Sequence, residues 1–133
     1  IKHTTANFGE QRAAQKIGIT VRAMGDGFTW RSRDLDQSAD LARALWDDAQ
    51  EIISTGGYDV VILDEFTYPM HYGWIPVEDV IETLKQRPEM QHVIITGRHA
   101  HEDLVEYADL VTEMSVVKHP YSSGIKAQPG IEF

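Results

Sequence analysis

The segment Val60-Val61-Ile62-Leu63-Asp64-Glu65 decides the fold. Four consecutive aliphatic residues are followed directly by two carboxylates, within a stretch that extends from residue 58 to residue 65. A strand that is apolar on both faces is typical of the middle of a parallel sheet covered by helices. The segment therefore predicts a parallel α/β architecture.

A second strand of the same kind follows one helix later. Residues 93–96 read VIIT and end at Gly97, which predicts another buried strand. Between the two strands, residues 76–87 have apolar side chains at helical spacing, with Pro76 at the first position and Pro88 after the last. The order strand, helix, strand is that of a parallel β-α-β unit.

The flanking sequence continues the alternation. Residues 34–54 form the clearest predicted helix, with an apolar residue every three or four positions. We also expect a short β-branched strand at 17–24, a short helix at 101–108, a last strand at 110–114, and a loop from Lys118 onward. Together these elements predict a single α/β domain over residues 1–133, with a three-layer arrangement and a mainly parallel sheet.

Composition and motifs exclude several classes of protein. The 133 residues contain 12 Lys and Arg, 21 Asp and Glu and no Cys, so the formal charge is −9. Such a charge argues against general nucleic-acid binding and against adhesion to anionic lipid. The absence of cysteine fits a reducing cytoplasm, and no apolar run is long enough to cross a membrane. We find no Ser/His/Asp elbow, no GxGxxG and no HExxH.

Ligands of parallel α/β sheets bind at the carboxyl ends of the strands. Asp64 and Glu65 end one strand, where their oxygens suit Mg²⁺, as in the Walker B element of P-loop proteins. Arg98 follows Gly97 after the other strand and suits a phosphate. The alternative is that the two acids and the arginine are simply solvated.

Two further groups are candidates for ligand contact. Phe28 and Trp30 follow a glycine-rich loop and lie two residues apart, which suits a flat platform for a ring ligand, unless Trp30 only caps the core. Lys118 and Lys126 lie in the tail, where they either neutralise a polyphosphate or belong to a flexible C-terminus. His99 and His101 are expected to be surface residues, because their spacing does not converge on a metal.

Several segments, taken in order, resemble the CobA/CobO/BtuR family of corrinoid adenosyltransferases. The matching segments are MGDGFTW (24–30), VILDEFTY (61–68), VIITGR (93–98), ADLVTEM (108–114), VKHP (117–120) and GIKAQPGIEF (124–133). Each is short, but their order over residues 24–133 makes the resemblance specific. The resemblance implies a P-loop NTPase fold of the RecA-like kind.

The resemblance also implies a reaction. This family transfers the 5′-deoxyadenosyl group of ATP to the cobalt of a reduced corrinoid and releases triphosphate. Glu65 matches the carboxylate that holds Mg²⁺ (or Mn²⁺), and Asp64 would orient a water or the hydroxyl of the missing P-loop. Phe28 and Trp30 match the aromatic pair that excludes the lower axial ligand of cobalt, and so makes Co(II) easier to reduce.

Further expectations rest on the resemblance alone. The cations that match family positions, and that would contact a ligand, are Arg98, Lys118 and Lys126. We also expect a homodimer in the cytoplasm and a flavoprotein reductase as a partner.

One departure from the family is large, because no GxxxxGK[ST] phosphate-binding loop occurs in the 133 residues. The sequence therefore predicts part of a longer protein, which the absence of an initiating Met favours, or a member that has lost nucleotide binding. Without the family's first strand, apolar faces of 60–63 and 93–95 should be exposed. The alternatives are a non-catalytic corrinoid-binding module, which lacks the ATP site, and a generic RecA-like ATPase, which has no need of Phe28 and Trp30.

Overall fold

A computed structural model describes residues 9–23 and 35–128 of the chain. It separates into two compact units. The first unit includes residues 23–109 and holds the sheet and most of the helices, whereas the second includes residues 5–22 and 110–133. Phe28 and Trp30 lie outside the described residues, as does the rest of 24–34.

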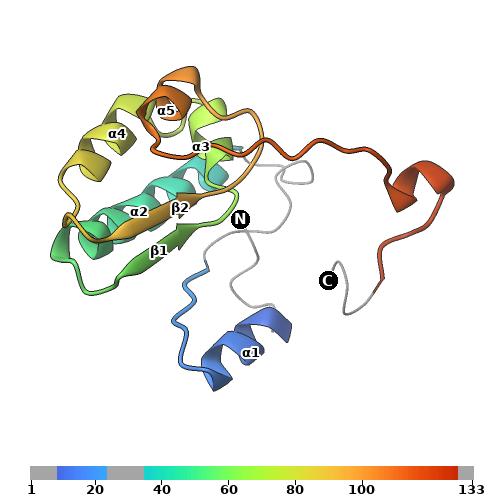
Figure 1. Ribbon diagram of the computed structural model, residues 1–133, viewed down its shortest axis with the longest axis horizontal. Coiled ribbons are helices and arrows are strands. Elements are labelled where there is room, and N and C mark those ends of the chain that lie inside the picture. Colours follow the sequence, from blue (N-terminus) through green and yellow to red (C-terminus); the bar gives the residue numbers. More distant parts are fainter. Residues whose placement is uncertain (1–8, 24–34, 129–133) are drawn as a thin grey trace. The chain divides into compact units, whose positions relative to one another are not determined.

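The first unit is built on a parallel pair of strands. Strand β1 (Val60–Leu63) pairs with β2 (His92–Ile95) in parallel, and Val60 lies opposite His92. Both strands were predicted from their aliphatic runs, and the parallel α/β class is confirmed. Within the described residues the sheet has these two strands, drawn side by side in Figure 1.

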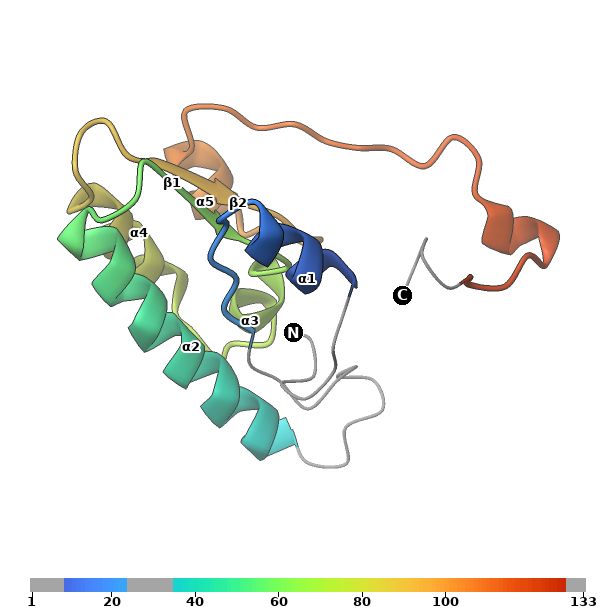
Figure 2. The ribbon, with the colours of Figure 1, turned by 90° about the horizontal axis from the view of Figure 1, so that it is seen from below.

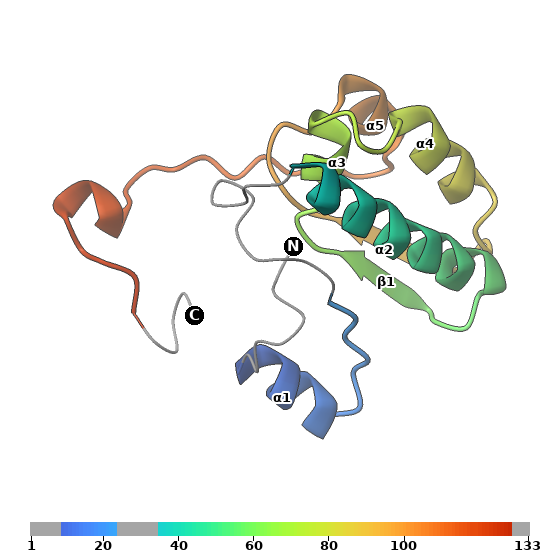
Figure 3. The ribbon, with the colours of Figure 1, turned by 180° about the vertical axis from the view of Figure 1, so that it is seen from behind.

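Helices cover one face of this sheet. Helix α2 (Leu35–Thr55) is the long predicted amphipathic helix, and α4 (Val77–Lys85) connects the two strands. Helices α3 (Thr67–His71) and α5 (Glu102–Tyr107) complete the layer, and α3 was not predicted from the sequence. Figure 3 shows α2 lying along the sheet, with α3, α4 and α5 beside it.

The core lies between the helices and the sheet. Its buried residues come from α2, α3, the loop after α3, α4 and α5: Trp46, Ala49, Ile53, Met70, Ile75, Val77, Val80, Leu84 and Leu104. Every second strand residue, beginning with Val61 and Val93, packs against this cluster. Burial of these apolar side chains is the main force that holds α2 and α4 onto the sheet.

The opposite face of the sheet is open in the first unit. Val60, Ile62 and Ile94 are 49%, 62% and 47% exposed. Because side chains alternate across a strand, these residues share the face that the helices do not cover. The expectation that the strands expose apolar side chains is confirmed. Among the described residues of the first unit, helices cover only the other face, and the three-layer arrangement stays a prediction.

The second unit contains little regular structure among its described residues. Helix α1 (Gly9–Lys16) buries no side chain, and a 3-10 helix occupies Pro120–Ser123 in the expected loop. Figure 2 shows α1 and the long extended segment that leads to this 3-10 turn. No helix in the described ranges is both long enough and apolar enough to cross a membrane.

Two predicted strands do not form. Residues 17–23, the described part of the expected strand 17–24, and residues 110–114 contain no strand. Ile17, Leu110 and Met114 are 73%, 85% and 91% exposed. A β-branched composition favours a strand, but a strand is stable only when a neighbouring strand supplies hydrogen bonds and a packed face.

Candidate functional site at the ends of β1 and β2

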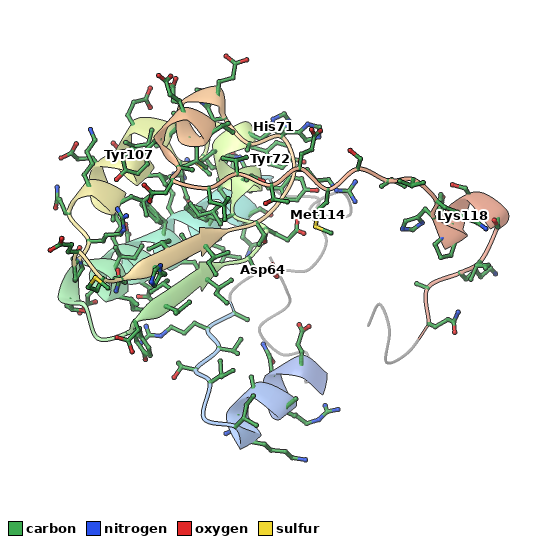
Figure 4. The ribbon with its side chains drawn as sticks, in the orientation of Figure 1. Asp64, His71, Tyr72, Tyr107, Met114 and Lys118 are labelled. Carbon is green, nitrogen blue, oxygen red and sulfur yellow. The ribbon has the colours of Figure 1, made fainter. Side chains whose placement is uncertain are left out.

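Asp64 and Glu65 follow β1 directly and are exposed at its carboxyl end. Figure 4 shows Asp64 at this end of the strand. The hydroxyl of Thr96, the residue after β2, donates a hydrogen bond to Asp64 Oδ1 at 2.8 Å. The hydroxyl oxygen of Thr96 in turn accepts a hydrogen bond from the backbone N–H of Glu65 at 3.0 Å. The side chain of the residue after β2 therefore contacts both acidic residues after β1.

Glu65 has an unusual backbone conformation. Its φ of 58° lies in the left-handed region, which costs a residue with a side chain about 1–2 kcal/mol. Such strain persists only where neighbouring contacts enforce it, and it concentrates at functional sites. The hydrogen bond from the Glu65 N–H to Thr96 is one such contact.

The loop after β2 is anchored to α3. Thr67 is 4% exposed, and its hydroxyl donates to the main-chain oxygen of Arg98 at 2.7 Å. Gly97, which precedes Arg98, has a φ of 140°, and a Cβ at this position would overlap the Thr67 side chain. Only glycine therefore fits there, and the backbone of Arg98 is held beside the end of β1. The sequence-based expectation that Arg98 holds a phosphate stays a prediction.

The charged side chains at the carboxyl ends of β1 and β2 determine which ligands could bind there. Two carboxylates and the exposed Arg98 lie after adjacent strands. Among residues 9–23 and 35–128, no three His, Cys, Asp or Glu side chains converge to hold a metal ion. Two carboxylates nevertheless suit Mg²⁺, which typically binds one or two protein carboxylates together with water and substrate phosphates.

Aromatic side chains from residues 71–74, which follow Thr67 in the chain, stack on one another and on His99. Tyr72 stacks on Trp74 with ring centroids 4.9 Å apart, and His71 stacks on His99 at 4.8 Å. His71 and Tyr72, both labelled in Figure 4, are exposed. The sequence predicted a surface position for His99, and its exposure agrees with this.

The other predicted ligand residues are not among the described residues of the first unit. Lys118 and Lys126 belong to the second unit, where both are exposed. Phe28 and Trp30 lie outside the described residues, so the aromatic platform stays a prediction. The described site therefore consists of Asp64, Glu65 and Arg98.

Sequence reasoning missed the contribution of the threonines. Thr67 and Thr96 stood inside the quoted segments 61–68 and 93–98, but neither threonine was given a role. The available signal was a hydroxyl residue directly after a buried strand whose parallel neighbour ends in carboxylates. Parallel pairing brings such residues together, although it does not specify which hydrogen bonds they make.

The paired carboxylates and the glycine-arginine turn lie at the carboxyl ends of two parallel strands, where α/β sheets bind their ligands. Comparison with known families is more specific. A family model described as ATP:corrinoid adenosyltransferase BtuR/CobO/CobP matches residues 1–133. The chain belongs to this family, which is a family of transferases.

Curated relatives agree with this assignment. The chain is 39% identical over 133 residues to the corrinoid adenosyltransferase of Escherichia coli (strain K12), a match that covers all of this chain and 67% of that protein. It is 38% identical over the same length to corrinoid adenosyltransferase CobA of Salmonella typhimurium, with the same coverage. It is also 47% identical to a Sinorhizobium corrinoid adenosyltransferase over 111 residues, 83% of this chain and 52% of that protein.

Proposed function

We propose that the protein transfers the 5′-deoxyadenosyl group of ATP to the cobalt of a reduced corrinoid and releases triphosphate. The match of the family model to all 133 residues carries this proposal. In the reaction, the electron pair of Co(I) attacks the 5′ carbon, a cobalt–carbon bond forms, and the carbon–oxygen bond to the triphosphate breaks. The nucleophile belongs to the substrate, which fits a chain without cysteine.

The carboxylate pair supports a role in holding the nucleotide. We assign Glu65 as the residue that would hold Mg²⁺ (or Mn²⁺), and Asp64 as the residue that would orient a water beside it. When bound, such an ion neutralises the triphosphate and makes it a better leaving group. Arg98 lies after the neighbouring strand and supplies a guanidinium that suits the same phosphates.

The remaining assignments rest on the family likeness. Phe28 and Trp30 would shield the lower face of the cobalt from an axial ligand, and Lys118 and Lys126 would contact the anionic ligand. A P-loop NTPase fold, a single domain, a homodimer, a flavoprotein reductase as partner and a cytoplasmic location are part of the same proposal. The parallel β1–β2 pair with carboxylates at its end supports the fold assignment.

The test is metal dependence of adenosylation. Glu65→Gln should raise the Mg²⁺ concentration needed for half-maximal rate by at least about tenfold, because it removes a charged oxygen ligand. Glu51→Gln on the exposed surface of α2 removes the same charge elsewhere and should leave that concentration unchanged. Equal Mg²⁺ dependence in both variants would refute the assignment of Glu65.

The reaction products discriminate the alternatives. Triphosphate together with an adenosylated corrinoid supports the transferase. Release of ADP without adenosylation would instead support a RecA-like ATPase, and corrinoid binding without turnover would support a binding module.

A further inference from the structure

Thr96 makes hydrogen bonds to Leu63 and Thr67, which flank the acidic pair, and to both acidic residues. Its backbone N–H donates to the Leu63 carbonyl at 3.1 Å, and its own carbonyl accepts from the Thr67 N–H at 3.4 Å. Its hydroxyl makes hydrogen bonds to the Asp64 carboxylate and to the Glu65 N–H. The main-chain bonds can be made by any residue, but the hydroxyl contacts require serine or threonine.

The direction of the two hydroxyl bonds is fixed by chemistry. A hydroxyl has one proton to donate, and Thr96 gives it to Asp64 Oδ1. Its lone pair then accepts the Glu65 N–H. The first hydrogen bond thereby orients the Asp64 carboxylate through one oxygen. The second holds the backbone N–H of Glu65, the residue whose φ is 58°.

We propose that Thr96 is a positioning residue whose hydroxyl sets the metal-binding geometry of Asp64 and Glu65. The direction in which the Glu65 side chain leaves the main chain depends on its backbone dihedral angles, and these are strained. Without the Thr96 hydroxyl, the Glu65 amide loses a partner and the Asp64 carboxylate is free to rotate. This inference rests on the proposed metal-binding role of Glu65.

The first measurement does not depend on activity. Thr96→Val keeps the shape of the side chain and removes both hydrogen bonds, so hydrogen exchange of the Glu65 amide should accelerate by about tenfold, the equivalent of one ordinary hydrogen bond. Thr96→Ser retains the hydroxyl and should exchange at the wild-type rate. Unchanged exchange in Thr96→Val would overturn the proposal.

The second measurement uses the metal. Thr96→Val should raise the Mg²⁺ concentration for half-maximal adenosylation by about three- to tenfold, as expected for loss of an outer contact that orients a ligand. Thr96→Ser should restore the wild-type value. Thr83→Val is the matched control, because Thr83 on α4 is buried, its hydroxyl donates to the Asp79 carbonyl, and it lies outside the site.

The outcomes separate this inference from the proposed function. If Glu65→Gln changes the Mg²⁺ dependence and Thr96→Val does not, Thr96 has no positioning role. If neither variant changes it, the metal assignment of Glu65 itself is wrong. If Thr83→Val shifts the Mg²⁺ dependence as much as Thr96→Val, the effect reflects general loss of stability and the positioning role is refuted.

Discussion

The side chain of Thr67 fills the space that a side chain at Gly97 would need. Thr67 begins α3 and Gly97 follows β2, so this contact packs the start of α3 against the loop after β2. The hydroxyl of Thr67 is also bonded to the carbonyl of Arg98, which fixes the turn. The approach of these two residues determines how near the phosphate-binding candidate Arg98 lies to the acidic pair.

Gly97→Ala should therefore lower the free energy of unfolding by about 2–4 kcal/mol, because a positive φ and a steric overlap coincide at this position. Gly73→Ala is the control: its φ is 69°, but a Cβ there meets nothing within 4 Å. It should cost only about 1 kcal/mol of backbone strain. Urea unfolding followed by circular dichroism measures both, and equal losses would contradict the role of Thr67.

Ile53 and Ile62 test which face of the sheet is buried. Ile53 on α2 is 0% exposed and Ile62 on β1 is 62% exposed. Ile53→Ala should lower the unfolding free energy by about 3 kcal/mol, since it leaves a cavity in the core. Ile62→Ala should lower it by less than about 1 kcal/mol. A loss at Ile62 as large as that at Ile53 would mean that the open face of the first unit is covered in solution.

The side chain of Arg87 makes hydrogen bonds to the last turn of α4 and to the last residue of α5. Its guanidinium donates to the Leu84 carbonyl at 2.8 Å and to the Tyr107 hydroxyl at 3.3 Å. Arg87→Lys should lower the unfolding free energy by about 1 kcal/mol, because an ammonium group cannot reproduce the planar fork.

The ion pair of Arg87 with Asp109 supplies the control for this prediction. It spans 3.6 Å, and the Asp109 side chain is 94% exposed. Asp109→Asn should change the same quantity by less than about 0.5 kcal/mol, since water screens the pair. A larger effect in Asp109→Asn than in Arg87→Lys would show that charge, and not the hydrogen bonds, is what matters.

Phe28 and Trp30 provide a test of the proposed chemistry. Phe28→Ala and Trp30→Ala should reduce adenosylation at least about tenfold when a flavin system reduces the corrinoid, because an axial ligand that stays bound makes Co(II) harder to reduce. With corrinoid supplied as Co(I), the same variants should lose much less activity. Equal losses in the two assays would contradict a role in excluding the axial ligand.

Local sequence pattern predicted most of the first unit. The strands β1 and β2 and the helices α2, α4 and α5 were each expected within a few residues of their observed bounds. Aliphatic runs and helical spacing are strong signals, because burial repeats with the period of the element. The short helix α3 was missed, since five residues, one of them Pro69, carry no recognisable period.

The two strands that were wrongly predicted show the limit of local pattern. Residues 17–23 and 110–114 have the composition of strands, but the described structure gives them no sheet neighbour. Strand formation depends on partners distant in sequence, and a single chain segment does not encode whether such a partner is present.

The sequence by itself determined the parallel strand pair, the amphipathic helices that flank it in the chain, and the acidic residues at its end. These follow from hydrophobic burial along short segments. The tertiary structure alone decided that Thr96 bonds to Glu65, 31 residues away, and that Glu65 adopts a strained backbone. Hydrogen bonds between strand ends depend on register and distance to a fraction of an ångström, and those quantities exist only once the chain has folded.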